Sequence, residues 1–232
     1  TIGLLTGSLM AIAQIGPIGG DYGAPRVVVP APENPRYEHL SWPKIVRARD
    51  GALVVACIAG RDHHTGGSPA VAISSDGGET FSPPAPLASF DAATEYRHSG
   101  NLALGVAQDG ALVLLAMAFT GEEKNTIFGW RSEDSGRTWQ PVDTSALADN
   151  QTGSVYGHVF PAGEHGLAVC GHYRKPSRPH EEGIWIAFSA DHGKTWGAAR
   201  RITSELLSLM PVRWQVSIIS RRCWQLIVWS AE

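Results

Sequence analysis

Arginine, histidine and acidic side chains gather in a few short segments of this 232-residue chain. One segment reads Arg61-Asp62-His63-His64, a second reads Tyr96-Arg97-His98, and a third, 171–180, contains Arg174 and two histidines. Guanidinium groups bind anionic oxygens through charge-assisted hydrogen bonds, and a carboxylate beside them can give or take a proton. If the fold brings these segments together, the sequence predicts a polar site for an anionic ligand.

Metal and nucleotide chemistry are not supported by the spacing of the candidate residues. His63 and His64 are adjacent, so on an extended chain they point apart, and no HxH or HExxH pattern accompanies them. The glycine pairs at 66–67 and 77–78 lack the Lys-Ser/Thr ending of a phosphate-binding loop. We therefore expect no metal, nucleotide or other cofactor.

The overall composition is that of a folded chain with many turns. It is 43% hydrophobic and 18% charged, with 26 glycines and 15 prolines. The net charge of −3 gives no basic field for a phosphate backbone, which argues against nucleic-acid binding. Cys57, Cys170 and Cys223 are too few for a disulfide framework. Cys57 and Cys170 lie in apolar runs, which predicts buried free thiols.

The N-terminal segment is apolar but short. Residues 2–13 cannot span a bilayer, and they end in Ala11-Ile12-Ala13, which fits a small-residue cleavage site. Residues 1–24 are thus predicted to be a signal-peptide remnant, which implies a secreted or periplasmic protein with no membrane span. The alternative is that these residues form a disordered N-terminus or an edge strand. In that case the protein can also be cytoplasmic.

A repeat dominates the rest of the sequence. The pattern Ser-x-Asp-x-Gly-x-Thr-aromatic occurs three times, at 74–81, 132–139 and 189–196, with its aspartates 58 and 57 residues apart. A second marker, Asp50-Gly51, Asp109-Gly110 and the weaker His165-Gly166, lies 24 or 25 residues before each of these aspartates. Two features at one offset in three copies indicate a repeated structural unit.

Each unit is predicted to contain four short strands. In the first unit we expect strands at 43–48, 52–59 and 70–74, a tight turn at Asp50-Gly51, a polar loop at 61–69, and a fourth strand after the box. Four strands in a repeat of about 40–50 residues are typical of a propeller blade, so the fold class is all-β.

Hairpin geometry sorts the loops between two ends of such a blade. The first turn and the box of each unit share one end, whereas the loop between the second and third strands and the segment leading into the first strand share the other. Seven of the nine histidines, and Arg61, Arg97 and Arg174, fall at the second end. The box residues Asp76, Asp134 and Asp191 fall at the first end and are predicted to hold their own turns, not to catalyse.

The three boxes resemble the Asp-box, or BNR, repeats of the sialidase (neuraminidase) superfamily. The resemblance covers residues 25–202 and implies a sialidase-like six-bladed β-propeller, of which residues 25–208 supply about three to four blades. Sialidases cleave terminal sialic acid with an arginine triad, a Tyr nucleophile paired with a Glu, and an Asp acid/base catalyst.

The resemblance also implies roles for particular residues. Arg61 matches the arginine that ends the second strand, Asp62 is the candidate acid/base catalyst, and Glu205 is nearest to the catalytic glutamate at the start of a fourth blade. The family's Arg-Ile-Pro motif is replaced here by 41–43, Ser-Trp-Pro, so the first triad arginine is absent. Further substrate-binding candidates at the polar end are His63, Arg97, His98 and Arg174.

The C-terminal residues 209–232 do not resemble a blade. No glycine follows Gly197, and there is no fourth box. A frameshift, a mispredicted gene end or a divergent closing segment would each produce this pattern, and the first two imply truncation after the third repeat. An open set of blades has unpaired edges, from which self-association is expected.

Three functions follow as expectations. The first is a sialidase-like glycoside hydrolase, or its N-terminal half that is inactive as given, acting at the end of a glycan on sialic acid or a related acidic sugar. The second is a non-catalytic propeller that binds glycan or protein, which the missing first arginine favours. The third is that the chain is a non-functional truncation.

Overall fold

The computed structural model describes residues 27–63, 66–90, 96–119, 125–147, 153–175 and 181–202, without the side chains of 174–175 and 181–182. The strands of this part are β1 (His39–Arg47), β2 (Leu53–Gly60), β3 (Ser68–Ser74), β4 (Ala85–Pro86), β5 (His98–Val106), β6 (Leu112–Phe119), β7 (Asn125–Ser132), β8 (Gln140–Pro141), β9 (Ser154–Pro161), β10 (Leu167–Lys175), β11 (Glu181–Ser189) and β12 (Arg200–Arg201). A single 3₁₀ turn, η1 (Gly163–His165), accompanies them in the described part. The predicted segments 1–24 and 209–232 lie outside the described residues.

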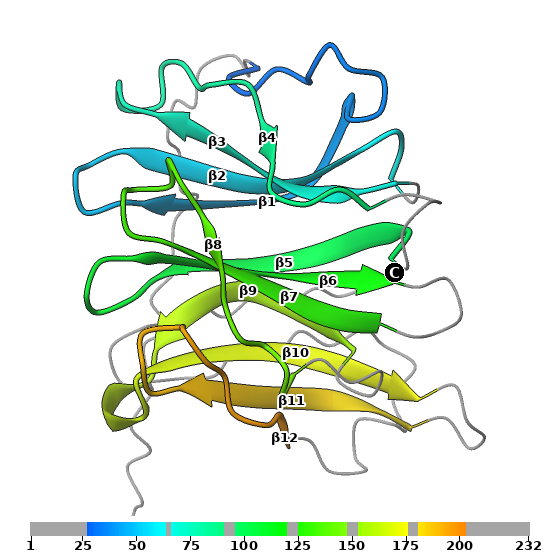
Figure 1. The fold of residues 1–232 in the computed structure, drawn as a ribbon, viewed down its shortest axis with the longest axis vertical. Coiled ribbons are helices and arrows are strands. Elements are labelled where there is room, and N and C mark those ends of the chain that lie inside the picture. Colours follow the sequence, from blue (N-terminus) through cyan, green and yellow to red (C-terminus); the bar gives the residue numbers. More distant parts are fainter. Residues whose placement is uncertain are drawn as a thin grey trace, which may run out of the picture.

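The strands form three four-stranded antiparallel sheets, each in sequence order from the inner to the outer strand (Figure 1). These are β1–β4, β5–β8 and β9–β12, and we call them blades 1, 2 and 3. The inner strands β5 and β9 also pair in parallel, through Leu104 and His158, which joins blades 2 and 3 into one sheet. The all-β propeller prediction is confirmed, and the described blades do not close into a ring.

In blade 1, β2 and β3 agree with the predicted strands to within two residues, whereas β1 begins four residues earlier than predicted. This strand begins at His39, not at Pro43, because it passes through a bulge: Ser41 pairs with Ile58 and Lys44 with Ala56, so two residues oppose one. Pro43 has no N–H to donate and sits inside this bulge, where no ladder bond is needed.

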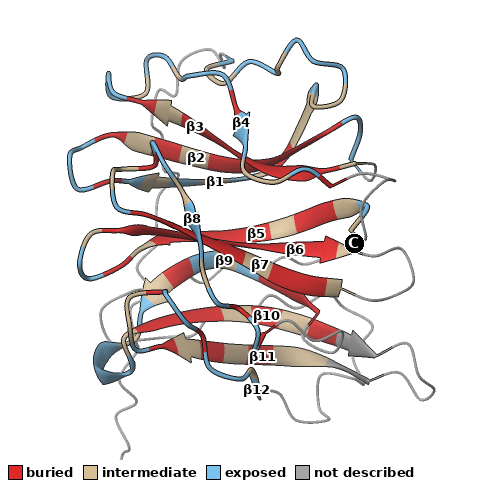
Figure 2. Ribbon diagram, viewed as in Figure 1, coloured by how far each residue is buried: buried red, intermediate tan, exposed pale blue. Residues whose placement is uncertain are grey.

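The core consists of two apolar layers between the blades. One layer, between blades 1 and 2, includes Ile58, Leu104 and Leu114; the other, between blades 2 and 3, includes Leu115, Val155 and Trp185. Strand β6 is buried from Leu112 to Ala118 because both of its faces meet a neighbouring blade (Figure 2). Consecutive apolar residues in β6, without alternation, follow from burial on both faces.

Each box closes on itself through one aspartate. Asp134 accepts hydrogen bonds from Ser132 Oγ (2.8 Å), Thr138 N (2.8 Å) and Thr138 Oγ1 (2.7 Å), while Ser132 Oγ accepts one from Gly136 N (2.8 Å). Burial acts to raise the pKa of Asp134, but these hydrogen bonds outweigh it and hold the pKa at about 2. Gly136 has φ of 90°, which only glycine adopts easily. The carboxylate is thus engaged in its own turn, as a structural role requires.

The two ends of the blades are separate, as expected. Strands β2, β6 and β10 run toward the right edge of Figure 1, and β3 and β11 run toward the left, where the boxes lie. We call the right edge the rim and the left edge the box face. No described helix is both long enough and apolar enough to cross a membrane.

Candidate functional site

The rim brings together the polar segments that the sequence singled out. Arg61, Asp62 and His63 directly follow the end of β2, Arg97 directly precedes β5, and His98 begins it. The backbone of Arg174 lies at the rim end of β10, paired with Glu182 of β11. Their common location is observed, while their roles stay predictions. Glu205 and the side chain of Arg174 lie outside the described part.

Blade 1 presents aromatic rings to the rim. The His63 ring lies over the Trp42 ring with centroids 4.2 Å apart, and His39 meets His63 edge-on at 5.8 Å. Trp42 is half-buried and packs against the core between blades 1 and 2. His39 Nε2 is buried without a hydrogen-bond partner. The surface that β1 offers here is therefore aromatic, with no guanidinium at positions 41–43.

Trp42 occupies an unusual backbone conformation. Its φ is 51°, although it is bulky and precedes a proline, and both properties disfavour positive φ. The bulge between Ser41 and Lys44 provides this conformation. The bulge turns the indole away from the direction that it would have in a regular strand.

A break in the strand pairing, with positive φ, recurs at this place in every blade. Asn101 (φ 27°) is the extra residue between Gly100 and Leu102 in β5, and Gly157 (φ 72°) lies in the irregular stretch of β9. Trp42, Asn101 and Gly157 precede the box aspartates by 34, 33 and 34 residues. The prediction missed this feature because three different residue types occupy it, and only Gly157 signals positive φ by itself.

Hydrogen bonds between blades tie the rim together. Gly67 N donates to His98 Nδ1 (3.3 Å) and Ser99 N donates to Gly67 O (2.7 Å), which joins blade 1 to blade 2. Asn101 Nδ2 donates to Ser154 Oγ (2.9 Å) and Asn125 Nδ2 to Gly153 O (2.7 Å), which joins blade 2 to blade 3. The Nδ1 of His98 acts as an acceptor, so His98 helps to position the rim.

Charge on the rim is carried by exposed side chains. Arg61, Asp62, His63 and Arg97 are all exposed. Long guanidinium side chains in this setting can reach an anionic ligand above the rim without losing their hydration beforehand. The rim therefore combines a charged outer layer with the aromatic surface of the inner strands.

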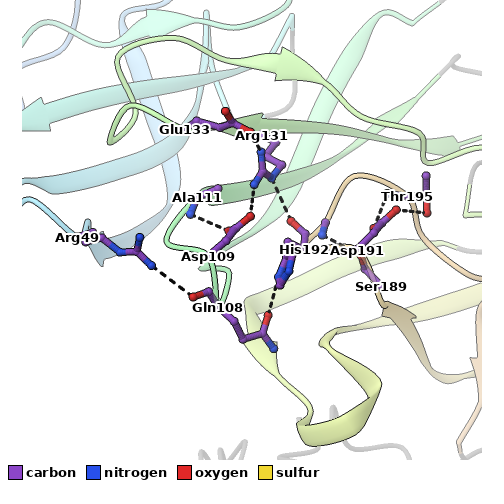
Figure 3. A network of polar contacts seen from close by, with 11 residues as sticks. Arg49, Gln108, Asp109, Ala111, Arg131, Glu133, Ser189, Asp191, His192 and Thr195 are labelled. Atoms are coloured by element: carbon purple, nitrogen blue, oxygen red, sulfur yellow. Dashed lines mark hydrogen bonds and ion pairs between the residues drawn. The ribbon is translucent and has the colours of Figure 1, made fainter.

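The box face holds a hollow of about 510 Å³ that the prediction did not foresee. Its floor is the buried side chain of Arg131, which pairs with Asp109 and Glu133 and donates Nε to His192 O at 3.2 Å (Figure 3). The other charged groups around it are also paired: Arg49 with Gln108 O, and Asp50 with Arg137. Because these charges satisfy one another within blade 2 and between neighbouring blades, we assign this hollow to blade packing and the candidate site to the rim.

Comparison with known proteins identifies the fold. No family model matches the sequence, and no curated protein matches it. Similar solved structures include the Hadza microbial sialidase Hz136 (20% identity, TM-score 0.56, covering 70% of this chain and 37% of that chain) and an α-L-arabinanase of Penicillium chrysogenum complexed with arabinobiose (16%, 0.53, 77% and 54%). Another is a K499G mutant of the NanB sialidase of Streptococcus pneumoniae (10%, 0.53, 76% and 46%).

These similarities show a sialidase-like β-propeller fold of the kind found in glycoside hydrolases. At such identities they show the fold alone. The chain spans between about a third and just over half of the length of these proteins, at 37%, 54% and 46%.

Proposed function

We propose that the protein is a sialidase-like glycoside hydrolase that acts at the end of a glycan on sialic acid or a related acidic sugar. One observation supports this most strongly: Arg61, Asp62 and Arg97 stand together with His63 and His98 on one rim, away from the boxes. In an open propeller rim, this is the arrangement that can bind an anionic sugar and donate a proton to it.

The proposed chemistry assigns one task to each charged group. Arg61 and Arg97 hold the sugar carboxylate by charge-assisted hydrogen bonds, which fixes the ring over the rim. Asp62, in its protonated form, donates its proton to the glycosidic oxygen as the bond between that oxygen and the anomeric carbon breaks. A nucleophile paired with a carboxylate, for which Glu205 is the candidate, bonds to the anomeric carbon as the leaving group departs. Water then attacks that carbon and gives a proton back to Asp62, which releases the sugar and restores the nucleophile.

Hydrolysis of a fluorogenic sialoside tests the proposal. Asp62→Asn should lower kcat by about 10²-fold or more, the usual contribution of a positioned general acid. Glu79→Gln, an exposed carboxylate on the box face, is the matched control and should leave turnover unchanged. Full turnover in Asp62→Asn would remove the acid/base assignment, and absence of turnover in the wild-type protein would remove the hydrolase.

A second function is favoured by Trp42. Ser41 stands on the innermost strand where the resemblance implies an arginine, and the neighbouring Trp42 presents an aromatic ring there, which suits a propeller that binds glycan without cleaving it. Binding to a glycan array without any product release would select this function. Arg97→Gln should weaken binding of sialylated glycans in either case, because both functions use the same guanidinium for the anion.

A further inference from the structure

The imidazole of His63 lies in a corner formed by two residues of the innermost strand of blade 1. Its ring lies over the Trp42 ring, with 4.2 Å between centroids and 35° between planes, and it meets the His39 ring edge-on at 5.8 Å and 85°. His39 begins β1, and Trp42 lies in the bulge of the same strand. His63 comes from a different element, since it follows the end of β2 by three residues. These contacts therefore bring the chain that leaves β2 back over β1.

The two rings that receive His63 are themselves held in place. The half-buried indole of Trp42 packs against the core between blades 1 and 2. Ser41 and Lys44, on the two sides of the bulge, are both paired with β2. The backbone of His39 is also paired, with the last residue of β2. The corner is thus part of the sheet and does not depend on a loop.

His63 is an exposed residue, so burial does not explain where its ring lies. Aromatic rings attract one another in tilted and edge-to-face arrangements, and both arrangements occur here. Because the imidazole is tilted by 35° from one ring and by 85° from the other, the two contacts restrain it about different axes. The ring of His63 is consequently fixed relative to β1.

Asp62 lies between two restrained neighbours. On one side, Arg61 directly follows the strand pairing of β2 with β1, and on the other side the His63 ring is held in the corner. Asp62 is exposed, yet its backbone has little freedom to move away from β1. A general acid must lie within hydrogen-bond reach of the oxygen that it protonates, and a misplacement of about 1 Å can lower the rate by roughly 10²-fold.

We propose that His63 is a positioning residue, whose ring is held by Trp42 and His39 and keeps the Asp62 carboxyl over the rim. The proposal rests on the proposed function, in which Asp62 is the general acid. It gives His63 a role other than the substrate binding predicted from the sequence, because the flat ring is what the corner requires. Trp42 acts through His63 in the same way.

Turnover of a fluorogenic sialoside separates the ring of His63 from its acid–base chemistry. His63→Ala should lower kcat by about tenfold or more and change KM by less than about threefold, because Arg61 stays anchored by β2 while Asp62 is released. His63→Phe keeps a flat ring without a titratable group, so it should restore most of the lost kcat. A His63→Phe variant as slow as His63→Ala, or full kcat in His63→Ala, would overturn the proposal.

His165→Ala is the matched control for these variants. It also removes an exposed imidazole that packs on an aromatic ring, that of Phe188 at 5.1 Å, but on the box face. Turnover in His165→Ala should equal that of the wild type.

Backbone ¹⁵N relaxation gives a readout that does not depend on turnover. The order parameter of the Asp62 amide should be about 0.85 in the wild type and in His63→Phe, and below about 0.6 in His63→Ala. Trp42→Leu should lower it as well and Trp42→Phe should not, with the melting temperature measured in parallel because Trp42 also packs on the core.

The relaxation result also separates this proposal from the proposed function. The same order parameter at Asp62 in the wild type and in His63→Ala would overturn the positioning role of His63. A wild-type protein that is rigid at Asp62 in a His63-dependent way but hydrolyses no sialoside would instead remove the hydrolase and keep the restraint on Asp62.

Discussion

Gly105 in β5 tests whether blades 2 and 3 pack along their inner strands as described. A Cβ at this position would lie 1.9 Å from Val159 O and 2.7 Å from Val159 C, both backbone atoms of β9. A carbon and a carbonyl oxygen normally stay about 3.3 Å or more apart. Gly105→Ala therefore requires β5 and β9 to separate by roughly 1.4 Å, which disrupts the Leu104–His158 pairing and loosens the core layer between the blades.

The expected cost is about 3 kcal/mol of unfolding free energy or more, at the upper end of overpacking because the clash is with backbone. For a chain of this size that corresponds to a decrease in Tm of roughly 6–12 °C. Gly100→Ala in the same strand is the control: its nearest neighbour is the flexible end of Met117, at 3.3 Å, so it should be neutral within about 1 kcal/mol. Urea denaturation followed by tryptophan fluorescence measures both. If Gly105→Ala is as stable as the wild type, the two inner strands are not in contact.

Three further predictions concern the boxes, the Arg131–Asp109 ion pair and the thiols. Asp134 has a pKa lowered from 3.8 to about 2 in the folded chain, so the unfolded chain binds the proton more tightly. Asp134→Asn should therefore be less stable than the wild type at pH 7. Urea titrations should show this difference in unfolding free energy shrinking as the pH falls from about 4 to 2. Arg131→Ile should lower the unfolding free energy by about 1–2 kcal/mol in the same assay, because Asp109 is 34% exposed and can regain water. Adding Asp109→Asn to Arg131→Ile should recover part of that loss of stability. A loss of stability that does not depend on Asp109 would contradict the ion pair. Burial raises the pKa of the Cys57 thiol to about 12 and that of the Cys170 thiol to about 11. Peptide mapping after treatment of the folded protein with iodoacetamide at about pH 8 should therefore find Cys57 unmodified. Rapid labelling of Cys57 would contradict its 2% exposure.

The repeat made the fold and its two faces predictable. The box spacing fixes the blade length, and the alternation of turns assigns each loop to one end of the blade, so the sequence alone predicts that Arg61 and Arg97 lie at the same end. The thiol prediction was correct for Cys57 but not for Cys170, which is half-buried. Cys170 follows buried Val169 in β10 and therefore points to the other face of the blade, and periodicity alone does not tell which face a neighbouring blade covers.

The bulges and the contacts of Arg131 could not be predicted for a different reason. Arg131 stands at the position that Ile73 occupies in blade 1 and Phe188 in blade 3, so the repeat pattern predicts an apolar residue there. One partner, Asp109, lies in another turn of the same blade. The other, the His192 carbonyl, lies in blade 3, so that contact depends on how the two blades face one another. The signal available in the sequence is that Arg131, a charged residue, breaks the apolar pattern of the repeat.

At the recurring bulge, the fold sets the backbone conformation, whereas the residue type differs from blade to blade. Positive φ at Trp42, ahead of a proline, costs on the order of 1–3 kcal/mol and persists only where the surroundings enforce it. Here the enforcement comes from the sheet, since Asn101 and Gly157 adopt the same sign of φ at equivalent positions with unrelated side chains. The backbone geometry is thus common to the blades, while the residue placed on each bulge decides what a ligand meets.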